Sequence, residues 1–466
     1  MPALNNGAKR ALVITEYLTP VNAVASIRWT KLIKYLTKDL GYEIDVLTNR
    51  KSYSPKTVFD PLYKYDKSME KDGAYIVHLT EAAPGLEERL INGIYWLALK
   101  RGARESYSSG SSRDSAKAST SASSDSIFRR STKKRVTDFL QRRLNASRYR
   151  SVSRKPVDWA RYDVVVSSFG PDWVHKIAYK SKRAKKDVVW IADYRDALAY
   201  SANTSTEKNL SFAKRWTALA DCVTAVSQGV IDNLNLPRGQ KYVVIPNGFD
   251  PEDLANTERE RDEKFRLVYT GALYLETNAK RDMSPLFDVL SSLIADKLVD
   301  PEYLVVEYAG PTEDLFWMQA SKAPNVPVVS YGMLPRGDAL ALQRSASGLV
   351  LATWNTKDAG GVVTGKVFEY FAAGVPIVGL CSGDVPDSVT KTMLEKSSTG
   401  FCYEEAVGDR SLYGLREYIL NLYNEWLSDG ITTCNANQDY IESFSYEVLA
   451  SQMNEVIQAA WKVNHD

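Results

Sequence analysis

Short runs of β-branched and aliphatic residues alternate with helix-like stretches along most of the 466-residue chain. Uninterrupted apolar runs of this kind are typical of parallel strands covered by helices on both faces. The runs form two series, and the join lies near Pro246–Lys264, where polar residues dominate and the periodicity lapses. The sequence therefore predicts an α/β protein with two doubly wound domains, which also suits its length. The expected strands are 11–15, 44–48, 75–79, 164–168, 188–192, 222–226 and 242–245 in the first series, and 266–269, 304–309, 326–331, 348–352 and 376–379 in the second.

A basic insertion at about 100–155 interrupts the first series. Residues 105–127 are almost wholly Ser, Ala, Thr, Gly and charged residues, and we expect them to be disordered. In Phe128–Lys155, Lys and Arg are abundant and Asp138 is the only acid, although the whole chain carries a net charge of only +2. Apolar residues within such a cluster favour a segment lying on an anionic membrane, and the preceding Glu87–Arg101 reads as an amphipathic helix.

Two alternatives to membrane binding stay open for this basic insertion. A solvated loop is one of them, and nucleic-acid binding is the other. We expect no nucleic-acid partner, because no aromatic stacking platform or recognised motif accompanies the charge.

Metal binding and membrane insertion are not expected. The four cysteines and three histidines lack the spacing of a zinc site, and we interpret the cysteines as reduced in a cytoplasmic protein. The apolar run Ala11–Ile14 is too short for a signal peptide or a membrane-spanning helix.

The segment Thr364–Pro376 predicts a ligand site. It reads as a Gly-rich loop followed by a short, mostly apolar helix that ends at Gly374. The start of the helix offers free backbone N–H groups and Lys366, which together suit a phosphate. Glu369 lies about one turn further in, where a buried carboxylate needs a partner such as a pair of ligand hydroxyls. A helix with a purely structural glutamate is the alternative.

The loop after the first expected strand, 16–26, is the candidate acceptor side. Loops at the carboxyl edge of a parallel sheet are where ligands bind, although no GxGxxG fingerprint is present. Small residues would allow close approach of the backbone to a ligand. We assign to this side Asn22, Ala23, Ser26 and Arg28.

A second charged loop follows the expected strand 188–192. Asp193, Arg195 and Asp196 stand close together there, either as a structural group of ion pairs or as a reaction-centre loop whose carboxylates orient sugar hydroxyls. His175 is interpreted as a structural histidine.

The segment Tyr269–Tyr274 repeats the plan of a strand and a small-residue loop in the second half. Thr270 and Gly271 would let the backbone approach a ligand, and Arg281 could neutralise a diphosphate. No DxD element is suitably placed for Mg²⁺, so we expect no metal cofactor.

Together these segments resemble the retaining glycosyltransferases of family 4, which have the GT-B fold. The most specific pieces are Ile191–Asp196, Ile245–Asp250 together with Ser227, Tyr269–Tyr274 and Thr364–Pro376. The resemblance implies two Rossmann-like domains facing a cleft, 1–245 and 246–445, with the nucleotide-sugar held chiefly by the second. It also implies a C-terminal helix within 446–466 that crosses back to the first domain.

The resemblance also implies roles for single residues. Glu369 corresponds to the carboxylate that binds the nucleotide ribose, Arg281 and Lys366 to the pair that neutralises the diphosphate, and Gly365 to a backbone contact beside it. The loop Tyr331–Pro335, with Tyr331 and Met333, corresponds to the loop that cradles the base. Many members have a second glutamate eight positions before the ribose-binding one, whereas this chain has Gly361.

The implied function is retaining transfer of a sugar from a UDP-sugar, or next a GDP-sugar, to a lipid-linked glycan in bacterial envelope polysaccharide synthesis. The enzyme would lie on the inner face of the cell membrane. The expected catalytic residues are Asp193, Arg195, Asp196, Arg281 and Lys366, and those expected to bind the nucleotide-sugar are Thr270, Gly271, Tyr331, Met333, Thr364, Gly365, Lys366 and Glu369. Two alternatives are another GT-B enzyme, such as an inverting transferase or an epimerase, and a non-catalytic binding subunit.

Overall fold

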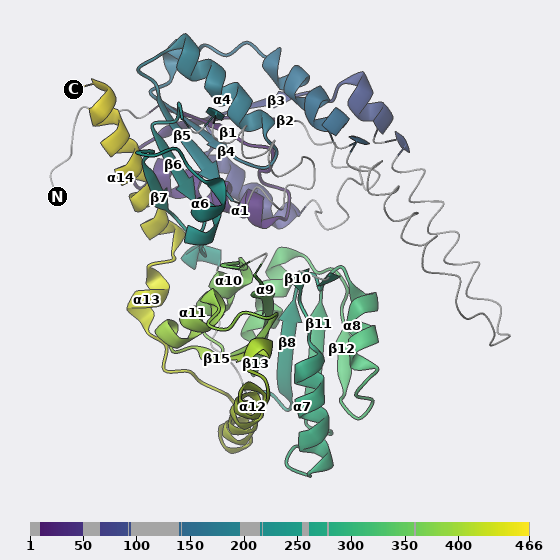
Figure 1. Ribbon diagram of the computed structural model, residues 1–466. Helices are drawn as coiled ribbons and strands as arrows, with labels where there is room; N and C mark the ends of the chain where they lie inside the picture. Colours follow the sequence, from purple (N-terminus) through teal and green to yellow (C-terminus); the bar gives the residue numbers. More distant parts are fainter. Residues whose placement is uncertain are drawn as a thin grey trace.

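Two parallel sheets, each covered by helices, form two domains that lie one above the other in Figure 1. The computed structural model describes residues 10–49, 66–91, 93–94, 139–140, 142–195, 215–216, 218–253, 261–276, 279–357 and 360–465. The low-complexity segment 105–127 and residues 128–138 of the basic insertion lie outside the described residues. Within the described part of the chain, no helix combines the length and apolar character needed to cross a membrane.

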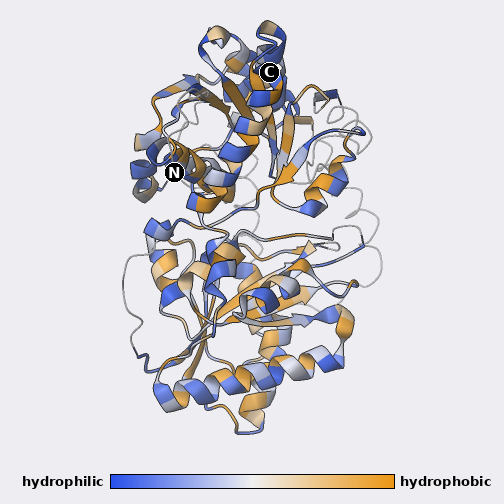
Figure 2. Ribbon diagram, turned by 90° about the vertical axis from the view of Figure 1, so that its left-hand side faces the viewer, coloured by the Kyte–Doolittle hydropathy of each residue, from blue (hydrophilic) through white to orange (hydrophobic). Residues whose placement is uncertain are grey.

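The first sheet has the strand order β3-β2-β1-β4-β5-β6-β7, and all its neighbouring strands are parallel. Both of its faces are buried, since Leu12 and Val13 pack into different hydrophobic clusters on opposite sides. Apolar residues accordingly concentrate on the strands in Figure 2. The strands are β1 Arg10–Ile14, β2 Glu43–Asn49, β3 His78–Ala82, β4 Val164–Ser168, β5 Val189–Tyr194, β6 Cys222–Ala225 and β7 Tyr242–Val244.

The second sheet has the order β12-β11-β8-β13-β14-β15 and is also parallel throughout. Alternate residues again enter different clusters, as Leu267 and Val268 do. A short antiparallel pair, β9 Leu275–Glu276 and β10 Ala279–Lys280, stands apart from this sheet. The sheet strands are β8 Phe265–Thr270, β11 Leu304–Ala309, β12 Val328–Ser330, β13 Gly348–Trp354, β14 Ile377–Ser382 and β15 Gly400–Glu404.

The last helix returns to the first domain. Tyr446, Leu449 and Met453 of this helix pack into the cluster of the first domain that also holds Val13 and Leu32. The labelled α-helices are α1 Val24–Lys38, α4 Trp173–Ala184, α6 Gln228–Leu234, α7 Ser284–Ala295, α8 Glu313–Ala320, α9 Arg336–Arg344, α10 Lys366–Ala373, α11 Val389–Ser397, α12 Asp409–Asp429, α13 Gln438–Glu442 and α14 Tyr446–His465, and the described residues 86–91, 93–94, 139–140 and 142–153 are helical as well. The 3₁₀ helices are η1 Lys67–Tyr75, η3 Trp159–Arg161, η5 Pro251–Asp253 and η6 Glu405–Val407.

The expected fold is confirmed: two doubly wound parallel sheets and a C-terminal helix that crosses back. The third strand starts at His78 rather than at Tyr75, because η1 extends to Tyr75. The edge strand β15 and the β9–β10 pair were not predicted. His175 is buried, its Nδ1 lies 2.7 Å from Ser167 Oγ, and burial lowers its pKa to about 3, as a structural role requires.

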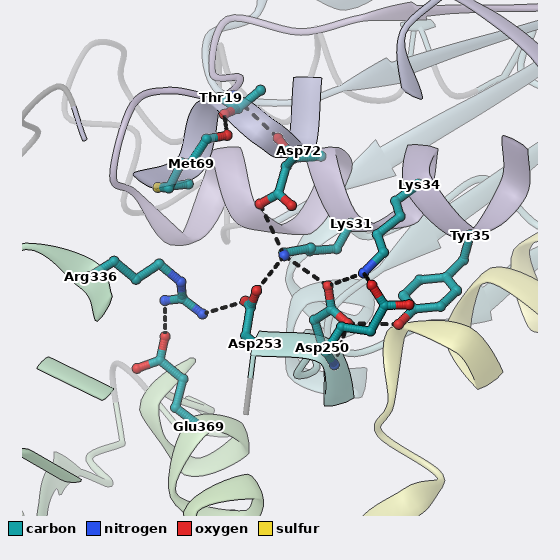
Figure 3. A network of polar contacts seen from close by, with 12 residues as sticks. Thr19, Lys31, Lys34, Tyr35, Met69, Asp72, Asp250, Asp253, Arg336 and Glu369 are labelled. Atoms are coloured by element: carbon teal, nitrogen blue, oxygen red, sulfur yellow. Dashed lines mark hydrogen bonds and ion pairs between the residues drawn. The ribbon is translucent and has the colours of Figure 1, made fainter. Parts of the chain in front are cut away.

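The linker between the domains comprises residues 246–253 in the described part of the chain. Helix α1 holds this linker through charged side chains (Figure 3). Lys31 Nζ lies 2.8 Å from Asp250, 2.7 Å from Asp253 and 3.0 Å from Asp72. Lys34 Nζ lies 2.7 Å from Asp250, and the Tyr35 hydroxyl donates to the same carboxylate at 2.6 Å. Burial alone would lower the pKa of Lys31, but the neighbouring carboxylates raise it above its ordinary value.

A second buried ion pair connects α1 with the end of β5. Arg28 and Asp193 both have fully buried side chains, and they are joined at 2.9 Å between Nη2 and Oδ1. Trp29 Nε1 and the Thr224 hydroxyl donate to the same carboxylate, each at 2.8 Å. Burial opposes ionisation, but Arg28 and these hydrogen bonds hold the pKa of Asp193 below its usual range. Arg28 also donates to the Pro246 carbonyl at 2.7 Å, which ties the pair to the linker.

Replacing Asp193 by Ala is expected to lower the free energy of unfolding by about 3–5 kcal/mol, because Arg28 would keep a buried charge without its partner. Urea unfolding measures this loss. The matched control is Glu43→Gln, which breaks the partly exposed pair with Arg10 and should cost no more than about 1 kcal/mol. Equal losses in the two variants would contradict the prediction.

Candidate functional site

A cavity of about 340 Å³ lies between the two domains. The first domain and the linker contribute Asn22, Ala23, Val24, Ala25, Ile27, Arg195 and Asn247. The second domain contributes Thr270, Gly271, Ala272, Tyr274, Arg281, Ala309, Gly310, Pro311, Met333, Leu334, Arg336, Ala339, Leu340, Gln343, Thr364, Gly365, Lys366 and Glu369.

Helix α10 presents its first turn to this cavity. Its apolar residues Val367, Phe368, Tyr370 and Phe371 are buried in the core beneath the sheet, which fixes the helix in place. Lys366 and Glu369 lie on the remaining face and line the cavity. The helix ends at Gly374, whose φ of 67° is the left-handed conformation that favours glycine.

Two cations stand side by side at the start of α10. Arg281 stacks on Tyr274 and Trp354, with 4.7 and 5.6 Å from its guanidinium carbon to the ring centroids, and donates to the Ala272 carbonyl at 3.2 Å. Burial and the neighbouring Arg281 lower the pKa of Lys366 well below its ordinary value. Among the described residues, no carboxylate forms an ion pair with either cation. The arrangement is therefore a cationic site without a directly paired carboxylate, although the charge of Glu369 acts to raise the pKa of Lys366.

Gly271 allows this packing of Lys366. Its φ is 118°, and a Cβ atom there would overlap the Cε and Nζ atoms of Lys366. The loop after β8 therefore leaves room for the lysine only because it carries glycine at this position.

Glu369 is held by two side chains of α9. Arg336 Nη1 lies 2.5 Å from its Oε1, and the Gln343 amide donates to its Oε2 at 3.4 Å. The same amide donates to the Thr270 hydroxyl at 2.9 Å, so Thr270 and Glu369 share one partner.

The opposite wall of the cavity comes from the first domain. Arg195 donates to the carbonyls of Phe169 and Gly170 at 3.0 and 3.1 Å, which holds its guanidinium at the cavity. Asn247 lines the cavity from the linker, and its buried Oδ1 has no hydrogen-bond partner among the described residues.

Several predicted site residues do not reach the cavity. Asp193 and Arg28 form a buried ion pair with each other. For Asp193, the geometry therefore shows the structural alternative and not the reaction-centre one. Ser26 is fully buried on α1. Tyr331 lies outside the lining and donates its hydroxyl to Glu307 at 2.6 Å. Asp196 lies outside the described residues.

The sequence interpretation missed Arg336 and Gln343. Both lie on α9, directly after the loop Tyr331–Pro335 that was assigned to the base. The helical spacing of seven residues between them was the available signal, because it places both on one face. Asn247 was named only as part of the family motif, without a role.

Gly361 stands where many family members have glutamate. Its φ is 72°, and a Cβ atom there would lie 3.4 Å from the Cα of Gly229 in the first domain. Such a distance is ordinary van der Waals contact, and it is the positive φ that disfavours a side chain at this position.

The chain is similar in structure to solved glycosyltransferases. It matches lipopolysaccharide outer core galactosyltransferase WaaB in its apo form with a TM-score of 0.53 and 13% identity, covering 97% of this chain and 99% of that one. It matches WaaG, a glycosyltransferase involved in lipopolysaccharide biosynthesis, with a TM-score of 0.51 and 10% identity over 96% and 99% of the two chains.

A third match is an E. coli structure described as "Trehalose-6-phosphate from E. coli bound with UDP-2-fluoro glucose". The TM-score is 0.57 and the identity 10%, over 96% of this chain and 99% of that one. No family model and no curated protein matches the sequence. At these identities the likeness concerns the fold, and it confirms the GT-B arrangement of two Rossmann-like domains.

Replacing Lys366 by Met should raise the stability of the protein by about 1 kcal/mol, because the substitution removes a buried amine whose charged form burial and Arg281 disfavour. The same variant should bind inorganic pyrophosphate more weakly. Thermal unfolding and calorimetric titration measure the two effects. The control is Lys391→Met on α11. This variant removes a lysine that is paired with Asp387, and it should leave pyrophosphate binding unchanged. A Lys366 variant that is less stable would show that the lysine is compensated.

Proposed function

We propose that the protein is a retaining glycosyltransferase that binds a nucleotide-sugar, with a UDP-sugar favoured, in the cavity between its domains. The observation that carries this proposal is the pair Arg281 and Lys366 beside the start of α10, which no described carboxylate contacts directly, with Glu369 about one turn further along. Cations at a helix N-terminus suit a diphosphate, and the carboxylate suits ribose hydroxyls. The E. coli structural neighbour was solved with UDP-2-fluoro glucose, which supports the choice of donor.

The charges at this site suit the departure of a nucleoside diphosphate. As the bond between the sugar and the diphosphate breaks, negative charge grows on the phosphate oxygens, and Arg281, Lys366 and the N–H groups of α10 can stabilise it. We propose that these groups act without a metal cofactor.

The choice of retention is supported by what else lines the cavity. Glu369 is the only carboxylate among the described lining residues, no described histidine lines it, and Arg336 pairs with Glu369. A dedicated nucleophile or general base is therefore not in evidence there, as expected when the acceptor attacks on the face that the leaving group vacates. The anomeric configuration of the product distinguishes this reaction from inverting transfer, and hydrolysis of a panel of nucleotide-sugars distinguishes an enzyme from a binding subunit.

A second cavity, of about 570 Å³, supports an acceptor site in the first domain. The loop after β1 separates the two cavities, since Glu16 and Leu18–Val21 line the second one and Asn22–Ala25 line the first. The described residues of the second cavity include Glu70 and Glu81 but no Lys or Arg. Such a lining suits the hydroxyl groups of a glycan better than an anionic group.

One polar atom of the second cavity is available to a ligand. Asn49 is 4% exposed, its amide donates to Glu16 at 3.2 Å, and its Oδ1 has no hydrogen-bond partner among the described residues. We propose that a hydroxyl of the glycan acceptor donates to this oxygen.

We further propose that the enzyme lies on the inner, cytoplasmic face of an anionic membrane, where a lipid-linked acceptor would be found. The described part of the basic insertion offers less free charge than the sequence suggested. Arg143 and Arg150 pair with Glu87, and Arg148 pairs with Glu16 and Glu88.

Exposed apolar side chains lie on the neighbouring helical residues 86–91 and 93–94. Leu86, Leu90 and Ile94 are 80%, 68% and 55% exposed, at a spacing of four residues that places them on one face. We therefore propose that this helix face contributes apolar contacts to membrane binding, beside the basic segment 128–155.

Replacing Glu369 by Ala is expected to weaken UDP binding about tenfold or more, because a hydrogen bond to a charged group contributes about 1.5–3 kcal/mol. Calorimetric titration with UDP measures the affinity. Glu395→Ala is the control, since this glutamate is exposed on α11 and lies outside the cavity. Unchanged affinity in a folded Glu369 variant would remove the ribose assignment.

Replacing Leu90 by Gln should reduce sedimentation with vesicles of equal parts phosphatidylcholine and phosphatidylglycerol. The affinity should fall about tenfold or more, because burial of a leucine side chain contributes about 1.5–3 kcal/mol. Leu427→Gln, on the exposed surface of α12 in the other domain, should sediment like the unaltered protein. If the unaltered protein ignores such vesicles, membrane binding by this surface is wrong.

A further inference from the structure

We propose that Arg336 is a positioning residue that couples occupancy of the nucleotide site to the linker between the domains. The proposal rests on the proposed function in one respect, namely that the ribose binds at Glu369. It goes beyond that function because it assigns a role to a residue outside the quoted family motifs and connects two parts of the molecule.

Arg336 bridges the nucleotide domain and the linker (Figure 3). It is the first residue of α9, and its guanidinium lies 2.5 Å from Glu369 on one side and 3.4 Å from Asp253 on the other. Its backbone N–H donates to Asp66 of the first domain at 2.7 Å, which fixes the start of α9 against that domain. Its side chain is 12% exposed, so little water competes for these contacts.

Asp253 carries the connection onward to the first domain. Its second oxygen lies 2.7 Å from Lys31 of α1, whose Nζ also lies close to Asp250 and Asp72. Asp253 does not line the cavity, whereas Arg336 and Glu369 do. A change at Asp253 can therefore reach a bound nucleotide only through intermediate groups.

The two carboxylates share one guanidinium, with Nη1 at Glu369 and Nη2 at Asp253. Arg336 lies closer to Glu369 than to Asp253. When ribose hydroxyls donate hydrogen bonds to Glu369, they replace part of the stabilisation that Arg336 gives to this carboxylate. Arg336 then turns toward Asp253 and strengthens its bond to the linker. Because such coupling is reciprocal, the linker in turn sets the affinity for the nucleotide.

The first test is a double-mutant cycle on UDP affinity, measured by calorimetric titration of the full chain. Asp253→Asn should weaken UDP binding about fivefold or more, because Arg336 then lacks an ionised partner when it leaves Glu369. In the Arg336→Gln background, the same Asp253→Asn change should leave the affinity unaltered. Equal effects of Asp253→Asn in both backgrounds would overturn the proposal.

Asp72→Asn is the matched control for the cycle. It removes a carboxylate from the same Lys31 but has no contact with Arg336, so UDP affinity should not change. A loss like that of Asp253→Asn would mean that the whole lysine cluster, and not Arg336, carries the effect. Arg336→Lys keeps the positive charge and should restore part of the coupling that Arg336→Gln removes.

The second test is amide hydrogen exchange at residues 250–253. Without nucleotide, Arg336→Gln should exchange faster there than the unaltered protein, because one contact to the linker is lost. UDP should slow exchange at these residues in the unaltered protein and have no such effect in Arg336→Gln. A structural role alone would not make the effect of UDP depend on Arg336.

The two tests separate the coupling from the proposed function. If no nucleotide binds the unaltered protein, the proposed function fails, while the exchange comparison without nucleotide still judges the link between Arg336 and the linker. If the two proteins exchange equally there, the link is absent whatever the protein binds.

Discussion

The attachment of the linker to helix α1 is the constraint on which the rest of the structure depends. Lys31 and Lys34 meet Asp250 inside the protein, and Arg28 binds the Pro246 carbonyl one turn earlier on the same helix. Buried ion pairs add little net stability, since desolvation offsets their attraction, but removal of one partner is costly. Such a cluster of buried ion pairs therefore specifies one orientation of the domains more than it adds to the free energy of unfolding. The domain orientation, and with it the interdomain cavity, follows from this arrangement.

The cavity shows the opposite electrostatic design. The linker cluster pairs its charges, whereas Arg281 and Lys366 face each other without a carboxylate partner among the described residues. Burial and the neighbouring Arg281 lower the pKa of Lys366, so both disfavour the charged form of this lysine. Under the proposed function, the diphosphate of the donor would stabilise that charged form.

What the sequence could predict depended on the range of the interactions involved. The parallel strands and α10 follow from local patterns, because apolar runs and the stop at Gly374 are written within a few residues. The pairs Arg28–Asp193 and Arg336–Asp253 join residues 165 and 83 positions apart, and no local pattern records such contacts. For this reason Asp193 was assigned to catalysis and Arg336 was overlooked. The strand β15 was missed because its partly polar sequence, Gly400–Glu404, lacks the continuous apolar run of the inner strands.

The return of helix α14 makes the first domain discontinuous along the chain. Its core needs Leu449, Met453 and Ile457, which are translated after every strand of the second sheet. During synthesis on the ribosome, the second domain has its full sequence before the first domain receives its last helix. The domain that starts first is therefore completed after the second one, and a nascent chain leaves the apolar surface around Leu32 and Val13 uncovered until α14 emerges.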